Sequence, residues 1–195
     1  MTVIFIKEAR SKGYLRLGIK DDGEKYDFTV SESEYREAGS PLVRDNLTRD
    51  AFDILCNADM RYRARIKALN ILSYGDNSEK NLKRKLSFKG FSQEVVNEVA
   101  SEMLSRGYIN PDRQIKKLVL NEVNIRHMGP MKIIPKLVAK GYLKSDVTRI
   151  ISELERDGEI DFEEAKMRLI ESKLGEEKDD TEKKKILYKN GYYVC

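Results

Sequence analysis

The chain of 195 residues has no tryptophan, one histidine and two cysteines. A single histidine leaves little material for a metal centre or a histidine-activated nucleophile. His127 stands beside Gly129-Pro130 at an expected helix end, where a cation would offset the helix dipole. Cys56 and Cys195 lie too far apart in sequence for a metal or redox motif. We expect one buried and one terminal thiol, a usage that fits a reducing cytoplasm.

Long apolar runs are also missing. No stretch approaches the ~18 residues that a membrane span needs, and the N-terminus lacks the cationic and apolar segments of a signal peptide. Neither phosphate-binding motif, GxxxxGK[ST] or GxGxxG, occurs. The 37 basic and 33 acidic residues nearly balance, and their interleaving is typical of solvated helix faces. We therefore expect a cytoplasmic, monomeric binding protein without metal or cofactor, and not an enzyme or a membrane protein.

What the chain does contain is a repeat of about fifty residues. Leu86–Phe91 (LSFKGF) returns as Leu137–Tyr142 (LVAKGY), and a fainter copy stands at Leu187–Tyr192 (LYKNGY). The glycines of the three copies are spaced by 51 and 50 residues, and Gly107 and Gly158 keep the same offset. Repeated units bury their apolar faces on their neighbours and form an extended surface, so the pattern favours binding over catalysis.

The first forty residues follow a different pattern. Apolar residues alternate with polar ones on both sides of Asp21-Asp22-Gly23, which predicts a β-hairpin. Val3–Ile6 is a candidate third strand. Ser31 with Glu34 three residues later has the spacing of a capping box, which predicts a short helix that ends at Gly39.

From Thr48 onward the signals are helical, with serine, aspartate or proline before each apolar segment and glycine after it. They predict a helix carrying Phe52 and Leu55, then a longer helix that ends at Gly75. We expect a mainly α fold: tandem three-helix repeats in an elongated array behind a small N-terminal β-hairpin module. The predicted domains are the module (1–45), the first repeat with its lead-in helix (46–107), the second repeat (108–158) and an incomplete third repeat (159–195).

Helix starts in the second and third repeats are predicted at Asn110-Pro111, at Gly129-Pro130, at Ser145 or Asp146, at Asp161 and at Thr181. Residues 176–182 read as a solvated loop. Pro135 conflicts with this pattern because it falls inside a short helix, where proline costs about 3 kcal/mol relative to alanine. Either that helix begins later than predicted or it is kinked.

Basic residues gather before and within the first repeat. Such a cluster can neutralise phosphates or meet an acidic protein surface, and it can also be a plain solvated face. At three of these positions, 80, 83 and 84, the second repeat has no charge, so the scaffold does not require it. The candidate partner-binding or DNA-binding residues are Arg61, Arg63, Arg65, Lys67, Lys80, Lys83, Arg84, Lys85 and Lys89.

Three aromatic residues, Phe91, Tyr108 and Tyr142, follow helix-ending glycines. Aromatic rings near cations can stack on bases. An apolar residue after a capping glycine usually folds back on the last helical turn, so we expect these rings to pack.

The order and spacing of these segments resemble the RecX family, the bacterial regulators of the recombinase RecA. The resemblance covers about residues 63–191 and is strongest in Ala68–Tyr74 (ALNILSY) and Ser78–Leu82 (SEKNL). The N-terminal hairpin is also similar to the extension of many members. Asn110-Pro111-Asp112 departs from the paired aspartates that the family often has, and Pro135 is unexpected.

The resemblance implies a partner that composition does not show. Members bind RecA, usually as its filament on DNA, and modulate its recombinase and ATPase activities, most often by inhibition. Some also bind DNA themselves. The alternative from another class is a helical-repeat protein that binds nucleic acid independently of a recombinase.

Overall fold

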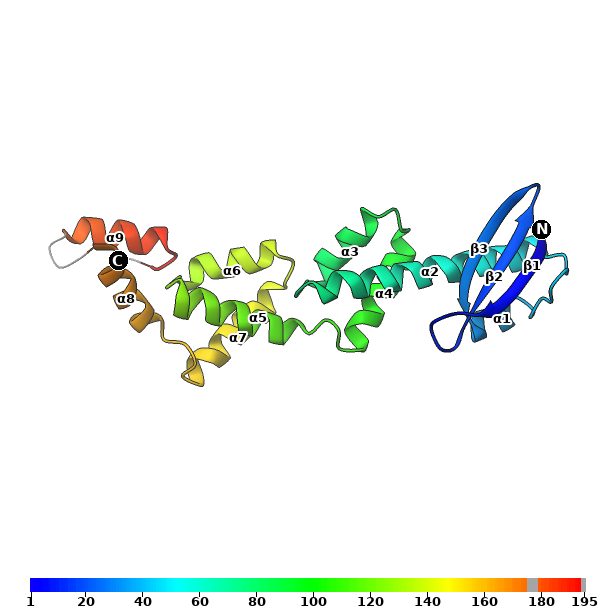
Figure 1. Cartoon of the computed structure of the whole chain (residues 1–195). Coiled ribbons are helices and arrows are strands. Elements are labelled where there is room, and N and C mark those ends of the chain that lie inside the picture. Colours follow the sequence, from blue (N-terminus) through cyan, green and yellow to red (C-terminus); the bar gives the residue numbers. More distant parts are fainter. Residues whose placement is uncertain (175–178, 194–195) are drawn as a thin grey trace. The chain divides into compact units, whose positions relative to one another are not determined.

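The computed structural model describes residues 1–174 and 179–193 (Figure 1). By its internal contacts the chain divides into two compact units. Unit 1 comprises residues 1–74 and 85–102, and unit 2 comprises residues 75–84 together with the chain from residue 103 onward. A small antiparallel sheet precedes a series of helices, so the predicted class, mainly α with an N-terminal β module, is confirmed.

The sheet of unit 1 has the order β1-β2-β3. It is built from β1 (Thr2–Glu8), β2 (Tyr14–Asp21) and β3 (Glu24–Ser31). Asp22 and Gly23 connect β2 and β3 with φ values of 42° and 92°. Two positive φ angles in a two-residue loop match the twist of paired strands, which is why an Asp-Gly pair suits this turn. The predicted hairpin is confirmed, and the candidate third strand is β1.

Two helices complete the N-terminal part of unit 1, α1 (Glu32–Glu37) and α2 (Arg49–Ser73). Ser31 and Glu34 form the predicted capping box, and the Thr48 hydroxyl accepts from the N–H of Ala51. One face of the sheet packs on α2, whose buried residues include Phe52 and Leu55 (Figure 1). The prediction of two helices between Thr48 and Gly75 was wrong. No glycine or proline interrupts residues 49–73, and one 25-residue helix forms.

The repeats begin with α3 (Glu79–Ser87) and α4 (Gln93–Ser105). The second repeat contains α5 (Pro111–Leu120), α6 (Pro130–Ala139) and α7 (Lys144–Arg156), and the third contains α8 (Phe162–Leu174) and α9 (Asp180–Lys189). From α3 to α6 and from α4 to α7 the helix starts are 51 residues apart, the offset read from the sequence. Five glycines at helix ends have positive φ, the conformation that a capping glycine adopts: Gly90 (85°), Gly107 (74°), Gly141 (97°), Gly158 (69°) and Gly191 (89°).

Within unit 2 the N-terminus of one short helix meets the C-terminus of the short helix one repeat later. Ser78, the residue before α3, donates its hydroxyl to the carbonyl of Lys140 at the end of α6 at 2.6 Å. The N–H of Gly129, the residue before α6, donates to the carbonyl of Asn190 at the end of α9 at 2.8 Å. Helix N-termini carry unpaired donors and C-termini unpaired acceptors, so the joint satisfies both.

The second repeat contains the departures from regular helix. The chain continues α5 with a π-helical turn, η1 (Asn121–Ile125), before the loop that leads to α6. Glu122 in this turn is 3% exposed and pairs with Lys136 at 2.7 Å and with Arg126 at 3.3 Å. α6 begins at Pro130 as predicted, so the alternative of a later start is wrong, and Pro135 lies inside the helix on its exposed side. Its missing N–H removes the helical bond to the carbonyl of Met131.

Other helix starts differ from the predictions by one or two residues. α7 begins at Lys144 after Leu143, which has no side-chain cap, so neither Ser145 nor Asp146 opens it. α9 begins at Asp180, one residue before the predicted Thr181, and therefore takes in part of the predicted loop. Residues 176–178 of that loop lie outside the described residues. Asp161 caps α8 as expected, its carboxylate accepting from the N–H groups of Glu163 and Glu164.

The core of unit 2 joins α5, α6 and α7. Apolar residues at helical spacing on these helices are fully or nearly fully buried, among them Ile115, Val119, Ile133, Leu137 and Ile150. A smaller cluster of Leu169, Leu187 and Tyr192 joins α8 to α9. Each helix therefore buries one apolar stripe, as the 3.6-residue period of the sequence requires.

Candidate interaction surfaces

Two of the predicted basic residues are engaged inside unit 1. Arg61 pairs with Glu34 of α1 at 2.9 Å, and its side chain is only 25% exposed. Arg65 holds Glu102 of α4 at 2.7 Å and donates to the hydroxyl of Tyr14. Burial lowers the pKa of Arg65, but its hydrogen bond with Glu102 and nearby negative charge raise that pKa to a net value above the ordinary one. These two arginines connect elements of the unit and have little surface left for a partner.

Arg63 is more accessible, with a side chain that is 61% exposed. It pairs with Asp59 at 2.6 Å, one turn earlier on α2. Asp59 is buried and also accepts from the N–H of Thr29 in β3. Burial raises the pKa of Asp59 above its usual value despite these partners. Arg63 thus both neutralises a buried carboxylate and presents charge to solvent.

A pocket in unit 2, here called the cationic pocket, contains two of the predicted residues. Its volume is about 500 Å³, and it is lined by the first turns of α3, by α5 and by the end of α6. Lys80 and Arg84 come from α3, Lys117 from α5 and Lys140 from the end of α6. The charged side chains that line it are these four cations and Asp76, which pairs with Lys117 at 3.1 Å. Its net charge is therefore positive, unlike the nearly neutral chain as a whole.

Hydrogen bonds fix the walls of the cationic pocket. Gln114 is 2% exposed, donates to the carbonyl of Asn77 and accepts from the hydroxyl of Tyr142 at 2.9 Å. Arg84 donates to the side-chain oxygen of Asn81. These hydrogen bonds hold the neutral polar groups of the pocket in place.

The remaining predicted cations have different surroundings. Lys83 pairs with Glu79 at 2.6 Å along α3, a half-buried i,i+4 pair on the helix surface that contributes little to stability. Lys67, Lys85 and Lys89 belong to unit 1 and line another hollow of about 330 Å³. The nine predicted residues are thus divided between the two units.

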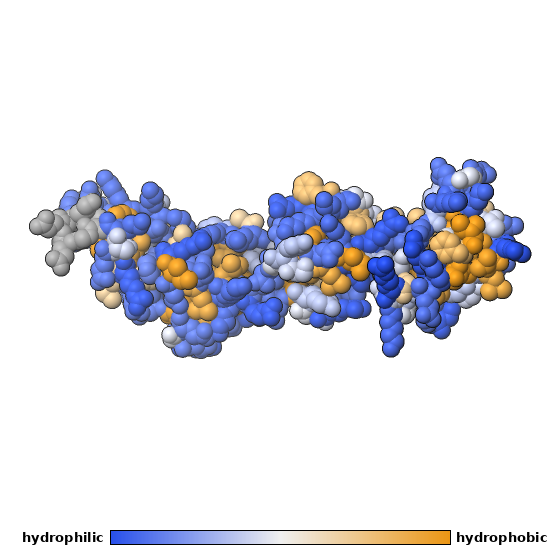
Figure 2. All heavy atoms as spheres, viewed as in Figure 1, coloured by the Kyte–Doolittle hydropathy of each residue, from blue (hydrophilic) through white to orange (hydrophobic). Residues whose placement is uncertain are grey.

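That second hollow, here called the aromatic groove, was missed by sequence reasoning. It is lined by three lysines, one amide and three apolar side chains: Lys67, Asn70, Ile71, Tyr74, Lys85, Phe88 and Lys89. Tyr74 is 93% exposed and Phe88 is 81% exposed. Figure 2 shows apolar atoms at the surface near α3, among hydrophilic side chains. The signal was present in the repeat, because Phe88 stands where the second repeat has Ala139.

The aromatic residues that follow capping glycines have mixed outcomes. Tyr142 is buried and Phe91 is partly buried, which confirms the packing prediction for both. Tyr108 is 49% exposed, so the packing prediction was wrong for this ring.

Histidine and cysteine residues could bind a metal or act as nucleophiles. Among the described residues, no group of histidine, cysteine and carboxylate side chains is arranged to hold a metal ion. Cys56 is partly buried against the core of unit 1, and Cys195 lies outside the described residues. His127 follows the π-helical turn with a φ of 52°, and its Nδ1 is buried without a hydrogen-bond partner in the described part of the chain. No helix in the described ranges is long and apolar enough to cross a membrane.

Successive three-helix units that follow a small antiparallel sheet along the chain define a helical-repeat protein whose accessible features are charged and aromatic surfaces. Residues 64–103 match the family model described as RecX, first three-helix domain. The chain is 37% identical over 131 residues to the regulatory protein RecX of Clostridioides difficile (strain 630), covering 67% of this chain and 59% of that protein. It is 27% identical over 167 residues to the regulatory protein RecX of Bacillus mycoides (strain KBAB4), covering 83% of this chain and 60% of that protein. The chain belongs to the RecX family.

A crystal structure of a regulatory protein RecX has the same fold, with a TM-score of 0.71 over 98% of this chain and 94% of that chain. Its sequence is 18% identical, so this likeness concerns the fold. The chain spans about three fifths of the length of the curated relatives that it matches. The matched family domain contains all the residues of the aromatic groove.

Proposed function

We propose that this chain binds the recombinase RecA, as its filament on DNA, and modulates recombination and ATP hydrolysis by that recombinase, with inhibition as the expected direction. The observation that carries the proposal is membership of a family whose relatives are named as regulatory proteins. The chain acts as a monomer by binding, without chemistry of its own. Support for binding comes from the two accessible surfaces and from the repeat, which offers several contact points to a repeating partner.

The nine predicted cations do not contribute equally to this proposal. Lys80 and Arg84 are exposed and line the cationic pocket, together with Lys117 and Lys140. Cations grouped in this way can meet backbone phosphates or acidic protein side chains on the filament. Arg61 and Arg65 are better explained by their ion pairs within unit 1. We therefore assign the cationic pocket, and not the arginines of α2, as the principal electrostatic contact.

The test measures RecA ATP hydrolysis and filament binding with the parent chain and with a Lys80→Glu, Arg84→Glu double variant. Both side chains are exposed, so helix content and melting should change little. Binding should weaken clearly at low salt and less at high salt, because exposed charges are screened. A parent chain without effect on RecA would remove the proposed function, and an unaltered double variant would remove the cationic pocket alone.

A matched control is available on α7. Lys144→Glu with Arg156→Glu makes the same change in net charge at exposed positions outside the cationic pocket. An equal loss of binding in both double variants would show that net charge, and not the pocket, governs association.

The alternative function, nucleic-acid binding without a recombinase, rests on the same cations. Titration of the parent chain against bare single- and double-stranded DNA over a range of salt separates the two. Binding to bare DNA as tight as binding to the filament would favour the alternative, with a salt dependence that counts phosphate contacts.

A further inference from the structure

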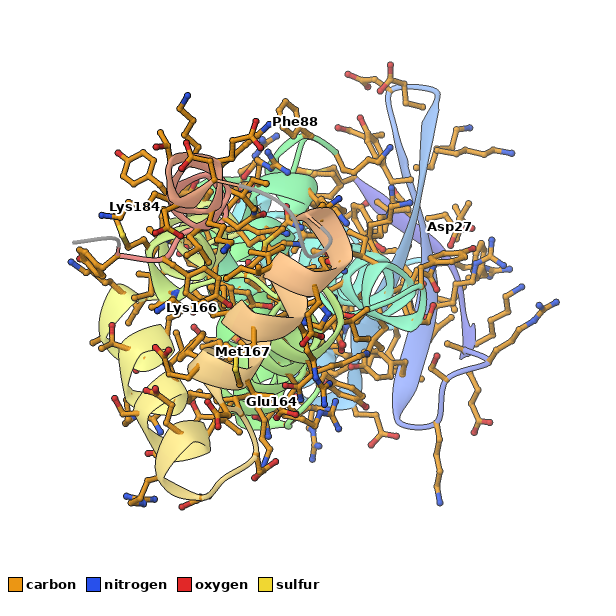
Figure 3. All side chains as sticks on the ribbon, turned by 90° about the vertical axis from the view of Figure 1, so that its left-hand side faces the viewer. Asp27, Phe88, Glu164, Lys166, Met167 and Lys184 are labelled. Carbon is orange, nitrogen blue, oxygen red and sulfur yellow. The ribbon has the colours of Figure 1, made fainter. Side chains whose placement is uncertain are left out.

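The aromatic groove of unit 1 contains two of the most exposed aromatic side chains in the described part of the chain. Tyr74 is the C-cap of α2, and Phe88 follows the last residue of α3. They are 93% and 81% exposed, and Phe88 projects away from the ribbon (Figure 3). Rings at this exposure give almost no stabilisation to the fold, since stabilisation follows the apolar area removed from water. Their concentration at one hollow marks an interaction site.

The repeat supports the same conclusion. At the positions equivalent to Ile71 and Phe88, the second repeat has Glu122 and Ala139. Both repeats form the same short helix, so that helix does not need the aromatic side chain of Phe88. An apolar surface that the scaffold does not require is available for a partner.

The charges around the groove restrict the partner. Its charged lining residues are Lys67, Lys85 and Lys89, with no carboxylate among the lining residues, in a chain where the two signs nearly balance. Lysine stems can lie along apolar surface while their ammonium groups stay in water at the rim. An apolar hollow with a cationic rim is complementary to an apolar side chain flanked by acidic residues.

We propose that the aromatic groove binds an acidic protein segment by taking one of its aliphatic or aromatic side chains between Tyr74, Phe88 and Ile71. This rests on the proposed function in one respect, since such a segment would belong to the recombinase filament. A protein segment is favoured over single-stranded nucleic acid because the hollow has the aliphatic Ile71 in its lining. A stacking platform needs flat ring faces, whereas a side-chain pocket needs enclosed apolar volume.

The first test uses a probe that does not depend on the recombinase. A fluorescein-labelled peptide with Phe and Leu between Asp and Glu residues is titrated with the parent chain, followed by anisotropy. We expect saturable binding that weakens with salt and that weakens about tenfold or more in Phe88→Ala and in Tyr74→Ala. A peptide with serine at the Phe and Leu positions should not bind. Absence of binding by the first peptide, or equal binding of both peptides, would overturn the proposal.

Substitution by leucine separates the two kinds of occupant. Leucine keeps apolar volume but has no ring, so Phe88→Leu should retain most peptide and filament binding if the groove holds a side chain. It should bind a bare oligo(dT) strand as the parent does. If Phe88→Leu and Phe88→Ala lose oligo(dT) binding alike, the groove is a base-stacking site and the proposal is wrong.

Tyr188→Ala is the matched control, because Tyr188 is 69% exposed and lies on α9, outside the groove. It should bind peptide and filament as the parent chain does. Filament binding that survives in Phe88→Ala, with peptide binding lost, leaves the groove as an acidic-segment site but removes it from the filament contact. Peptide binding by a parent chain that has no effect on RecA would refute the proposed function and retain the groove.

Discussion

Helices α3 and α6 occupy the same place in successive repeats, but they differ in the residues on their outer faces. α3 carries lysines and an arginine on its outer face, whereas α6 has methionine, isoleucine and proline at the equivalent positions. The N-terminus of each is nevertheless joined to the C-terminus of the short helix one repeat later. The repeat therefore maintains the joint between helix ends, and the outer face is left to vary with function.

The joint has an asymmetry that can be tested through its glycines. A β-carbon on Gly141 would lie 2.8 Å from the Cβ of Lys80, whereas a β-carbon on Gly90 would meet nothing within 4 Å. Both glycines have positive φ. Gly90→Val should therefore destabilise by about 1–2 kcal/mol from backbone strain alone. Gly141→Val adds a collision at the joint and should cost roughly 2–5 kcal/mol.

Chemical denaturation of the two glycine variants measures this difference directly. Equal losses of unfolding free energy would mean that the joint is loose enough to absorb a side chain, and the joint would then lose its structural role.

Tyr192 follows the capping glycine Gly191 at the end of α9, and its burial makes the stability of the third repeat depend on pH. Burial raises the pKa of Tyr192 to about 12, and its hydroxyl donates to the carbonyl of His127. The folded state favours the neutral phenol, so this stabilisation is complete below the ordinary tyrosine pKa of about 10 and is lost as pH rises to about 12. The loss should reach about 2–3 kcal/mol.

Urea melts of the parent chain and of Tyr192→Phe between pH 8 and pH 12 isolate that contribution. The Phe variant should lose less stability over this range, whereas Tyr188→Phe should behave like the parent because Tyr188 is exposed. Identical pH profiles for the parent and Tyr192→Phe would contradict the buried hydroxyl.

Ser78 and Ser92 both cap helices, and the Ser78 hydroxyl also reaches the next repeat. Its hydroxyl accepts from the N–H of Asn81 and donates to the carbonyl of Lys140, and the residue is 4% exposed. Ser92 accepts from the N–H of Val95 at 3.4 Å and is exposed. Ser78→Ala should cost about 1–2 kcal/mol and Ser92→Ala about 0.5–1 kcal/mol. Thermal melts of the two variants that coincide would show that the contact with Lys140 adds nothing to the cap.

The smallest expected effect concerns the outer face of α3. Lys80→Met introduces the residue that α6 has at this place, Met131. Stability should change by no more than about 0.5 kcal/mol, because the side chain is exposed. Filament binding at low salt should fall. A variant that melts at a lower temperature but binds normally would show that position 80 serves stability and not binding.

Local signals sufficed for much of the fold. Capping residues, glycines after apolar stripes and the Asp-Gly turn act through neighbouring backbone atoms, so Ser31, Thr48, Asn110 and Gly141 could be read correctly. Helix boundaries failed where a local signal competes with packing. α7 begins after Leu143 although Ser145 and Asp146 offer better caps.

The candidate sites were also predicted only in part from the sequence. The sequence by itself determined that cations gather on α2 and α3, but it could not tell which of them have intramolecular partners. Arg61 and Arg65 are held by Glu34 and Glu102, which lie far from them in sequence. The cationic pocket needed Lys117 and Lys140 to come near Lys80.

The aromatic groove shows the limit of sequence reasoning most clearly. Tyr74 and Phe88 are fourteen positions apart and belong to no shared motif. Their exposure is set by what the other helices cover, which no local pattern records. The sequence determined the repeat, the helix ends and the class of fold, since these depend on periodicity and on backbone conformation near each residue. Only the tertiary structure decided which charges are paired and which rings stay in water, because both depend on side chains that folding brings together from distant positions.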